Sequence, residues 1–368
     1  MDNIQMVDLG GQLKHIRKEV DEAIANVLNT TAFIKGEDFK EFTSELALWN
    51  NSKHTIGVAN GTDGLQIAMM ALGLKPGDEV IVPVFTYVAT AEVIALLQLK
   101  PVFIDVEPDT FNIDVRQLET VLTAKTKAIV PVHLFGQISN MNSINEFAIK
   151  NSLYIIEDVA QAIGAEYNGK KAGNLGHIGV TSFFPSKNLG CFGDGGAIFT
   201  NDDQLAENIR MIANHGQKVK YYHDVIGVNS RLDTLQAAIL RVKLKELNNY
   251  IISRQSAAQY YDQELSEVDW IETPGRFEDS THVFHQYTIK VKNGKRDNLK
   301  EYLQNKGIPS MIYYPVPLHL QKAYSGLAVK GDFPVSEQLC DEVLSLPMHT
   351  ELDDHQLEYI CSTIKSFK

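Results

Sequence analysis

The chain has 368 residues, with 34 Lys plus Arg, 46 Asp plus Glu and a formal net charge of −12. Its 44% hydrophobic and 22% charged residues are typical of a globular protein, which excludes general disorder, collagen-like fibres and low-complexity assemblies. This length predicts about two domains and a core that needs no disulfides.

The acidic balance argues against nucleic acid as a partner, because binding phosphate backbones needs a clustered basic face. The densest basic stretch, residues 241–245, has helical spacing and predicts a solvated helix face. Three widely spaced cysteines without a C-x-x-C pair predict a reducing compartment, and no metal is expected. The first twelve residues lack signal-peptide features and no apolar run is long enough for a membrane span, so we expect a cytoplasmic protein without membrane contact.

Apolar residues recur at helical spacing near the N-terminus, which predicts helices over 15–29 and 37–49. Short apolar runs then alternate with helical patterns. We expect strands over 54–58, 79–82, 101–105, 128–132, 153–157, 180–184 and 197–200, and helices over 65–72, 86–97 and 205–213. This alternation predicts right-handed crossovers and an α/β fold with a mostly parallel central sheet.

The pattern changes after residue 213. Residues 215–231 are rich in Gly, Tyr and Asn without clear periodicity, which is typical of a functional or interfacial loop. The elements expected next are a long helix over 232–265, a strand near 284–291, a helix near 296–306, a strand near 311 and a helix over 353–364. We therefore predict a large domain over 1–245, including the N-terminal helices, and a smaller C-terminal α+β domain over 246–368.

Three predicted strand ends carry residues suited to one ligand, because ligands of open α/β sheets bind at the carboxyl ends of the strands. The first is the loop over 60–64. Gly61 permits a tight turn, the free amides of the next helix make an anion site, and Thr62 can add a hydroxyl donor. The alternative is a plain helix start capped by Thr62 or Asp63.

Asp158 follows the second strand end. A carboxylate there is costly to desolvate unless it meets a cation, and a pyridinium nitrogen is one such cation. Gln161 lies three residues further on and could face the same ligand. The alternative is a helix-capping aspartate.

Lys187 follows the third strand end, among aromatic residues, Pro and Gly. Burial lowers the pKa of a lysine and makes its free amine nucleophilic, ready to form a Schiff base, whereas the alternative is a surface lysine. A phosphate loop, then an aspartate, then a lysine is the order found in fold-type I pyridoxal phosphate enzymes.

Seven motifs together resemble the DegT/StrS family of nucleotide-sugar aminotransferases along essentially the whole chain. They are ANGTDGL (59–65), PVFTYVAT (83–90), EDVAQ (157–161), FPSKNLG (184–190), GDGGA (193–197), NSRLD (229–233) and YPVPLH (314–319). The resemblance implies fold type I, pyridoxal 5′-phosphate as cofactor, and transfer of an amino group from an amino acid, expected to be glutamate, to a keto-sugar nucleotide.

The resemblance also implies a role for individual residues. Lys187 would form the Schiff base and Asp158 would pair with the pyridine nitrogen. Gln161 would contact the ring hydroxyl and Tyr87 would stack on the ring, while Thr62, the Asp63 amide and Ser182 would hold the phosphate. Asn229 would reach the partner subunit's cofactor, so a homodimer with shared active sites is expected. Four residues would lie near the sugar nucleotide, also across the interface: Arg231, Tyr313, Tyr314 and His319.

The run over 186–196 looks most like members that aminate carbon 3 of UDP-2-acetamido-2-deoxy-3-keto-glucuronate, for surface-polysaccharide sugars of the lipopolysaccharide O-antigen type. Lys187 argues against the related dehydratases, which have His there. The alternatives are a dTDP-3-keto-6-deoxyhexose or a UDP-4-keto sugar as substrate and, in another class, a non-catalytic regulator that binds the cofactor.

Overall fold

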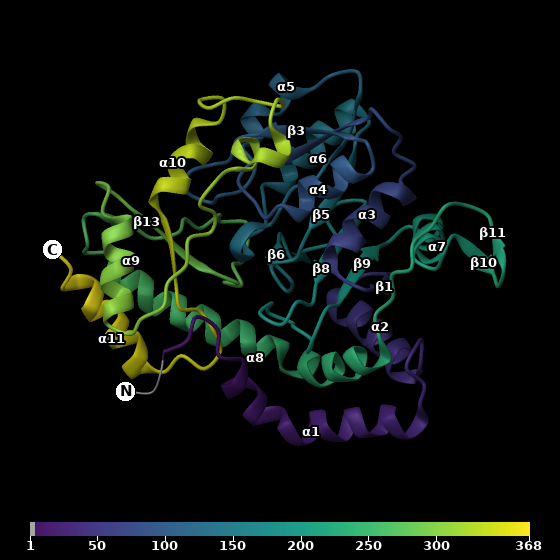
Figure 1. The fold of residues 1–368 in the computed structure, drawn as a ribbon, viewed down its shortest axis with the longest axis horizontal. Coiled ribbons are helices and arrows are strands. Elements are labelled where there is room, and N and C mark those ends of the chain that lie inside the picture. The colour runs from purple at the N-terminus through teal and green to yellow at the C-terminus, as the bar shows by residue number, and fades with distance from the viewer. Residues whose placement is uncertain (1–3) are drawn as a thin grey trace.

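The computed structural model describes residues 4–368. Residues 1–3, which begin the segment where we expect no signal peptide, lie outside the described residues. Helices and strands alternate through most of the chain (Figure 1). The helices are α1 (Leu9–Thr30), α2 (Glu37–Asn50), α3 (Gly61–Ala71), α4 (Ala89–Leu96), α5 (Leu118–Val121), α6 (Met141–Asn151), α7 (Asp203–Ile212), α8 (Thr234–Leu265), α9 (Arg296–Asn305), α10 (Pro334–Glu342) and α11 (Asp354–Lys365). The strands are β1 (His54–Val58), β2 (Glu79–Pro83), β3 (Lys100–Ile104), β4 (Thr126–Ile129), β5 (Tyr154–Asp158), β6 (Glu166–Tyr167), β7 (Lys170–Lys171), β8 (Ile178–Ser182), β9 (Gly196–Thr200), β10 (Gln217–Val219), β11 (Tyr222–His223), β12 (Ile271–Glu272), β13 (Tyr287–Val291) and β14 (Val343–Leu346). Within residues 4–368 no helix has the length and apolar character needed to cross a membrane.

The central sheet has seven strands in the order β1-β9-β8-β5-β4-β2-β3. The five strands from β8 to β3 run parallel, whereas β9 is antiparallel to both of its neighbours. Successive side chains point to opposite faces, so Ile155 joins a core with α2, α6 and α8, and Ile156 joins a core with α3, α4 and α7. The predicted α/β fold with a mostly parallel sheet is confirmed.

A second, antiparallel sheet has the order β12-β13-β14. The end of α8 packs against it together with α9 and α11, through buried residues such as Tyr261, Leu299 and Ile360. In Figure 1, α8 runs along the lower part of the molecule from below the central sheet toward α11. The predicted domain boundary after residue 245 falls inside this helix and stays a prediction.

Two expectations about the later elements need correction. Residues 215–231 include the hairpin of β10 and β11, which projects from the body of the molecule (Figure 1). Met311 forms only an isolated bridge with Ser345 instead of a strand. α10 was not predicted, and neither was β14. A four-residue strand directly after a helix, as β14 is, is too short to show a period of its own.

We had expected the basic stretch over 241–245 to form a solvated helix face, but only Lys245 is exposed. Arg241 bridges to α2 through ion pairs with Asp38 and Glu45 at 2.7 and 2.8 Å. Lys243 is only 1% exposed. The helical spacing was predicted correctly, but packing of α2 against α8 makes Arg241 an interhelical contact, and Lys243 lies over the Phe192 ring.

Candidate functional site

Asp158 is held at the carboxyl end of β5 by two hydrogen bonds. It is 7% exposed, and its Oδ2 accepts a hydrogen bond of 2.8 Å from the Thr90 hydroxyl. Its Oδ1 accepts one of 3.1 Å from the Ala160 amide. Hydrogen bonds to a carboxylate favour its charged form and fix its orientation. The predicted acid is therefore a buried and oriented group rather than a helix cap.

Lys187 lies in the turn after β8, where its amide donates a hydrogen bond of 2.8 Å to the Phe184 carbonyl. Burial lowers the pKa of its amine to about 8, and the negative charge of Asp158 opposes that effect. Burial and the positive charge of Lys187 hold the pKa of His285 well below its usual range. The lysine therefore lies within electrostatic reach of both the aspartate and the histidine.

The first turn of α3 packs against the end of β8. A Cβ on Gly61 would lie 2.9 Å from the Ser182 Cβ, so this position needs glycine. The cap is Asn60, whose Oδ1 accepts a hydrogen bond of 2.8 Å from the Asp63 amide. That amide is thus already bound, whereas the amides of Gly61 and Thr62 donate to no group among residues 4–368. Two free amides and nearby hydroxyls make this turn suited to an anion.

Tyr314 and Gln161 form one wall of the site. The Gln161 amide donates a hydrogen bond of 3.3 Å to the Tyr314 hydroxyl, and its oxygen accepts one of 2.7 Å from the Phe135 amide. The Tyr314 ring centre is 6.5 Å from that of Tyr87, which is 59% exposed. Tyr314 therefore lies against predicted cofactor residues of its own chain, where we had expected it across an interface.

The other two aromatic residues predicted for the substrate differ in access. Tyr313 is half-buried, with its ring centre 6.0 Å from that of Tyr314. His319 is 2% exposed, and its Nε2 lies 3.0 Å from Glu337 Oε1. Tyr313 thus borders the site, whereas the His319 side chain is enclosed by protein.

Asn229 and Arg231 lie on the segment that leads into α8. Asn229 is exposed and forms a bridge with Asn214. Arg231 is half-buried and has no ion pair with any acid among residues 4–368, Asp233 included. No hydrogen bond or ion pair joins either residue to Asp158 or Lys187 in the described part of the chain.

Sequence reasoning missed Thr90, Asn60 and His285. Thr90 and Asn60 stand inside the quoted motifs, but no pattern distinguished them from helix-forming neighbours. His285 Nδ1 is buried and has no hydrogen-bond partner among the described residues. A buried unpartnered ring nitrogen near a half-buried lysine marks a polar site that the protein atoms alone do not complete.

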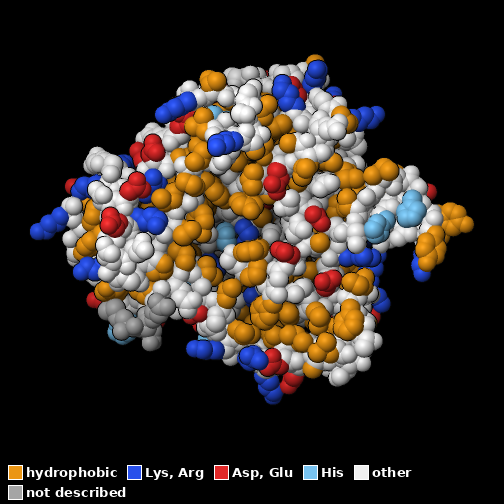
Figure 2. Space-filling view, viewed as in Figure 1, with side chains coloured by type: hydrophobic (Ala, Val, Ile, Leu, Met, Phe, Trp, Pro, Cys, Tyr) orange, Lys and Arg blue, Asp and Glu red, His pale blue; other side chains and the backbone are white. Residues whose placement is uncertain are grey.

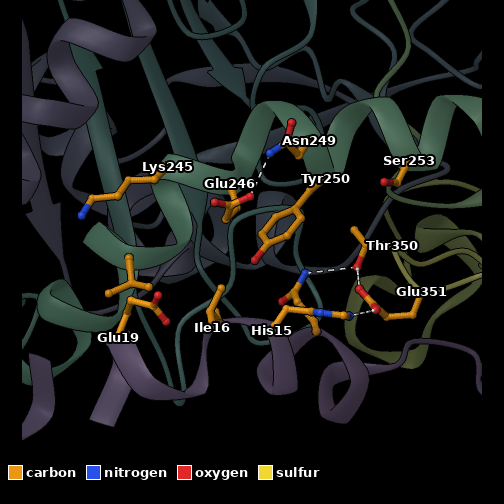
Figure 3. Close-up of a pocket in the computed structure, with 12 residues that line it drawn as sticks. His15, Ile16, Glu19, Lys245, Glu246, Asn249, Tyr250, Ser253, Thr350 and Glu351 are labelled. Atoms are coloured by element: carbon orange, nitrogen blue, oxygen red, sulfur yellow. Dashed lines mark hydrogen bonds and ion pairs between the residues drawn. The ribbon is translucent and has the colours of Figure 1, made fainter. Parts of the chain in front are cut away.

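Figure 2 shows a hollow in the middle of one face, with basic and histidine side chains at its floor and hydrophobic side chains around it. A separate cavity of about 500 Å³ lies between α1, α8 and residues 350–351. It is lined by His15, Glu246 and Tyr250 among others (Figure 3). This cavity contains none of the predicted site residues.

Comparison with known proteins identifies relatives over the full chain. The model of the DegT/DnrJ/EryC1/StrS aminotransferase family matches residues 14–365. A pleiotropic regulatory protein of Geobacillus stearothermophilus is 47% identical, covering 99% of this chain and 98% of that protein. The UDP-2-acetamido-2-deoxy-3-oxo-D-glucuronate aminotransferase of Pseudomonas aeruginosa is also 47% identical, covering 98% of this chain and 99% of the enzyme.

Solved structures of relatives share the fold of this chain over almost its whole length. The crystal structure of DesV from S. venezuelae, in complex with a ketimine intermediate, superimposes with a TM-score of 0.96. It is 38% identical and covers 99% of this chain and 98% of that chain. The likeness therefore extends over both sheets and the segments between them.

Proposed function

Because this chain belongs to the DegT/DnrJ/EryC1/StrS aminotransferase family, we propose that it transfers an amino group from glutamate to carbon 3 of UDP-2-acetamido-2-deoxy-3-keto-glucuronate. The observation that supports this substrate most is the 47% identity to the Pseudomonas aeruginosa enzyme over nearly its full length. The half-buried Arg231, which no acid in residues 4–368 neutralises, adds a cation suited to the sugar carboxylate.

The cofactor of this family is pyridoxal 5′-phosphate, and the residues of this chain fit it. A lysine of lowered pKa stands beside a fixed carboxylate, and free amides with neighbouring hydroxyls lie at the start of α3. We assign Lys187 to the aldehyde, Asp158 to the ring nitrogen, and Thr62, Ser182 and the free amides to the phosphate. By resemblance, Tyr87 and Gln161 contact the ring.

When bound, pyridoxal phosphate supplies an electron sink for the bonds of the amino carbon. Lys187 contributes an amine that is partly unprotonated near neutral pH, so it can take and return the proton of the donor's α-carbon. The negative charge of Asp158 would stabilise a positive charge on the ring nitrogen, to which we assign this residue. The Thr90 hydroxyl prevents that carboxylate from rotating away.

We further propose a homodimer in which Asn229 serves the neighbouring subunit's site. Asn229 is exposed, and the adjacent hairpin carries large exposed apolar side chains that a partner would cover. They are Val219 (60% exposed), Tyr221 (78%) and Tyr222 (69%), and Ile226 (86%) follows shortly after the hairpin. We also propose that the enzyme works in the cytoplasm, in the synthesis of O-antigen or lipopolysaccharide sugars. The three free and buried cysteines agree with the reducing cytoplasm.

The substrate is tested by running the enzyme in reverse with 2-oxoglutarate. We expect turnover of the UDP-linked 3-amino-glucuronate and rejection of the same sugar without its carboxylate, because unpaired site charges disfavour that analogue. Equal efficiency with a dTDP-linked 6-deoxy amino sugar or a UDP-4-amino sugar would replace the proposed substrate and leave the aminotransferase activity standing. A regulator would instead bind the cofactor without any glutamate-dependent change in its absorbance.

A further inference from the structure

The connection between α1 and α2 lies in a fixed register beside the segment that precedes α8. Ile34 forms a bridge with Asp233, and the Thr234 amide donates a hydrogen bond of 2.9 Å to the Phe33 carbonyl. The Gly36 amide donates one of 3.1 Å to the Thr234 hydroxyl. A Cβ on Gly36 would lie 2.9 Å from Thr234 Cγ2, so the approach of the two segments is close. They therefore behave as one unit.

This unit carries two cations, Lys35 and Arg231, which we call the cation pair. Leu232 is 1% exposed and enters the core, so Arg231, its neighbour along the extended segment, points to the other side. Lys35 is exposed at a left-handed turn with φ 54°. Partial desolvation of its amine and the nearby positive charge of Arg231 both lower the pKa of Lys35. Each cation thus lies in the field of the other.

No acid compensates the cation pair among residues 4–368, although α2 begins with several carboxylates. Glu37 pairs with Lys40 at 3.0 Å. The remaining acids of this helix are held by Arg241 on α8, namely Asp38, Glu41 and Glu45. Two neighbouring cations without a counter-charge create a local positive field in a chain of net charge −12, and that field favours an anionic ligand.

We propose that the cation pair is the anion subsite of the nucleotide-sugar substrate, with Lys35 on the diphosphate and Arg231 on the sugar carboxylate. The inference rests on the proposed function and adds a residue to it. Because the two segments are hydrogen-bonded together, Lys35 enters whichever active site Arg231 enters. A compact ammonium suits the diphosphate, and the planar guanidinium suits the carboxylate.

Binding of UDP to the cofactor-loaded enzyme, measured by calorimetry, tests Lys35 apart from the sugar. The variant is Lys35→Asn, because asparagine tolerates the left-handed backbone that this position requires. We expect Lys35→Asn to weaken UDP binding about tenfold, the loss of one charge-assisted hydrogen bond, and Lys35→Arg to retain most of it. The matched control is Lys40→Asn, which removes an exposed cation already paired with an acid.

The salt dependence of binding gives a second readout. The UDP dissociation constant should rise less steeply with salt in Lys35→Asn than in the wild type, because one fewer cation contributes. Unchanged UDP affinity in Lys35→Asn would overturn the subsite even if the acid sugar is turned over normally. Weaker UDP binding together with failure on the acid sugar would instead support the subsite and reject the substrate proposed above. A wild-type enzyme that binds neither UDP nor dTDP would overturn both.

Discussion

The Thr90 hydroxyl donates a hydrogen bond of 2.8 Å to Asp158 Oδ2, joining the start of α4 to the carboxyl end of β5. Both residues are buried, at 1% and 7% exposure. A buried hydrogen bond to a charged acceptor is stronger than a neutral one, so this contact fixes the carboxylate before any ligand arrives. Thr90 is therefore a positioning residue for the acid that we assign to the ring nitrogen.

Thr90→Val should lower kcat for the proposed transamination about tenfold, because the side chain keeps its shape and loses one hydrogen bond to a charge. Thr90→Ser is the matched control and should remain close to wild type. Steady-state kinetics and the cofactor dissociation constant are the measurements. Wild-type values for both in Thr90→Val would remove Thr90 from the mechanism.

Asp158→Asn should reduce kcat by orders of magnitude, because the charge that favours a protonated ring nitrogen is lost. Thermal unfolding should change much less, since the amide oxygen of the asparagine can still accept one of the two hydrogen bonds, from Thr90 or from the Ala160 amide. If the variant is nearly as active as wild type, the partner of the ring nitrogen lies elsewhere.

Lys187 should react as an unusually acidic amine in cofactor-free protein. The rate of its modification by an amine-specific reagent, followed by mass spectrometry, should have its midpoint near pH 8, whereas an exposed lysine titrates near about 10.4. Because the folded pKa is the lower one, the unfolded chain binds more protons, and this group's contribution to stability rises with pH between those two values.

The same experiment separates the two causes of the Lys187 shift. Asp158 raises the pKa of the lysine against the effect of burial, so Asp158→Asn should move the midpoint to lower pH. Movement to higher pH would mean that the two residues do not face each other.

The order of elements and the strand ends could be predicted from the sequence, because short apolar runs alternate with helical spacing. The hydrogen-bond and ion-pair partners of the polar side chains could not be predicted in this way. Nothing in the spacing of Thr90 and Asp158 indicates a contact between residues 68 positions apart. The surroundings of residues 241–245 were predicted wrongly for the same reason. A pattern of charges along one helix does not show which acids of another helix pair with it.

The proposed sharing of the active site between two subunits can be tested with mixed dimers. Lys187→Ala and Asn229→Ala should each be inactive or nearly so as homodimers, and heterodimers of the two should recover activity. If Asn229 serves the neighbour, one site of the heterodimer holds both defects and the other holds neither. Verified heterodimers with no recovery would place Asn229 in the site of its own subunit.

Arg231→Lys should raise KM for the acid sugar more than for an analogue without the carboxylate, because an ammonium does not reproduce the two-pronged contact of a guanidinium. The glutamate half of the reaction, followed by cofactor absorbance, should be unchanged and serves as the control. An equal rise in KM for both sugars would assign Arg231 to the part that they have in common.

The cofactor residues were easier to predict than the substrate residues. Lys187 and Asp158 each follow a buried strand of the same sheet, so the fold itself brings them together. Tyr314 and His319 are only five residues apart, yet one lies against Gln161 and the other is enclosed with Glu337. Irregular chain between elements has no periodicity from which such a difference could be read.

At 1.5 Å per residue, the 32 residues of α8 span about 48 Å. The helix touches α1 and α2 as well as α11, so it acts as a strut between the two sheets. Because α8 is one continuous helix, a shift at one of its ends moves the other end as well. In the proposed homodimer, a displacement of the segment before Thr234 by the neighbouring subunit would be passed along α8 toward the C-terminal sheet. Substitutions in the middle of this helix could then alter the spacing of the sheets from a point remote from any ligand.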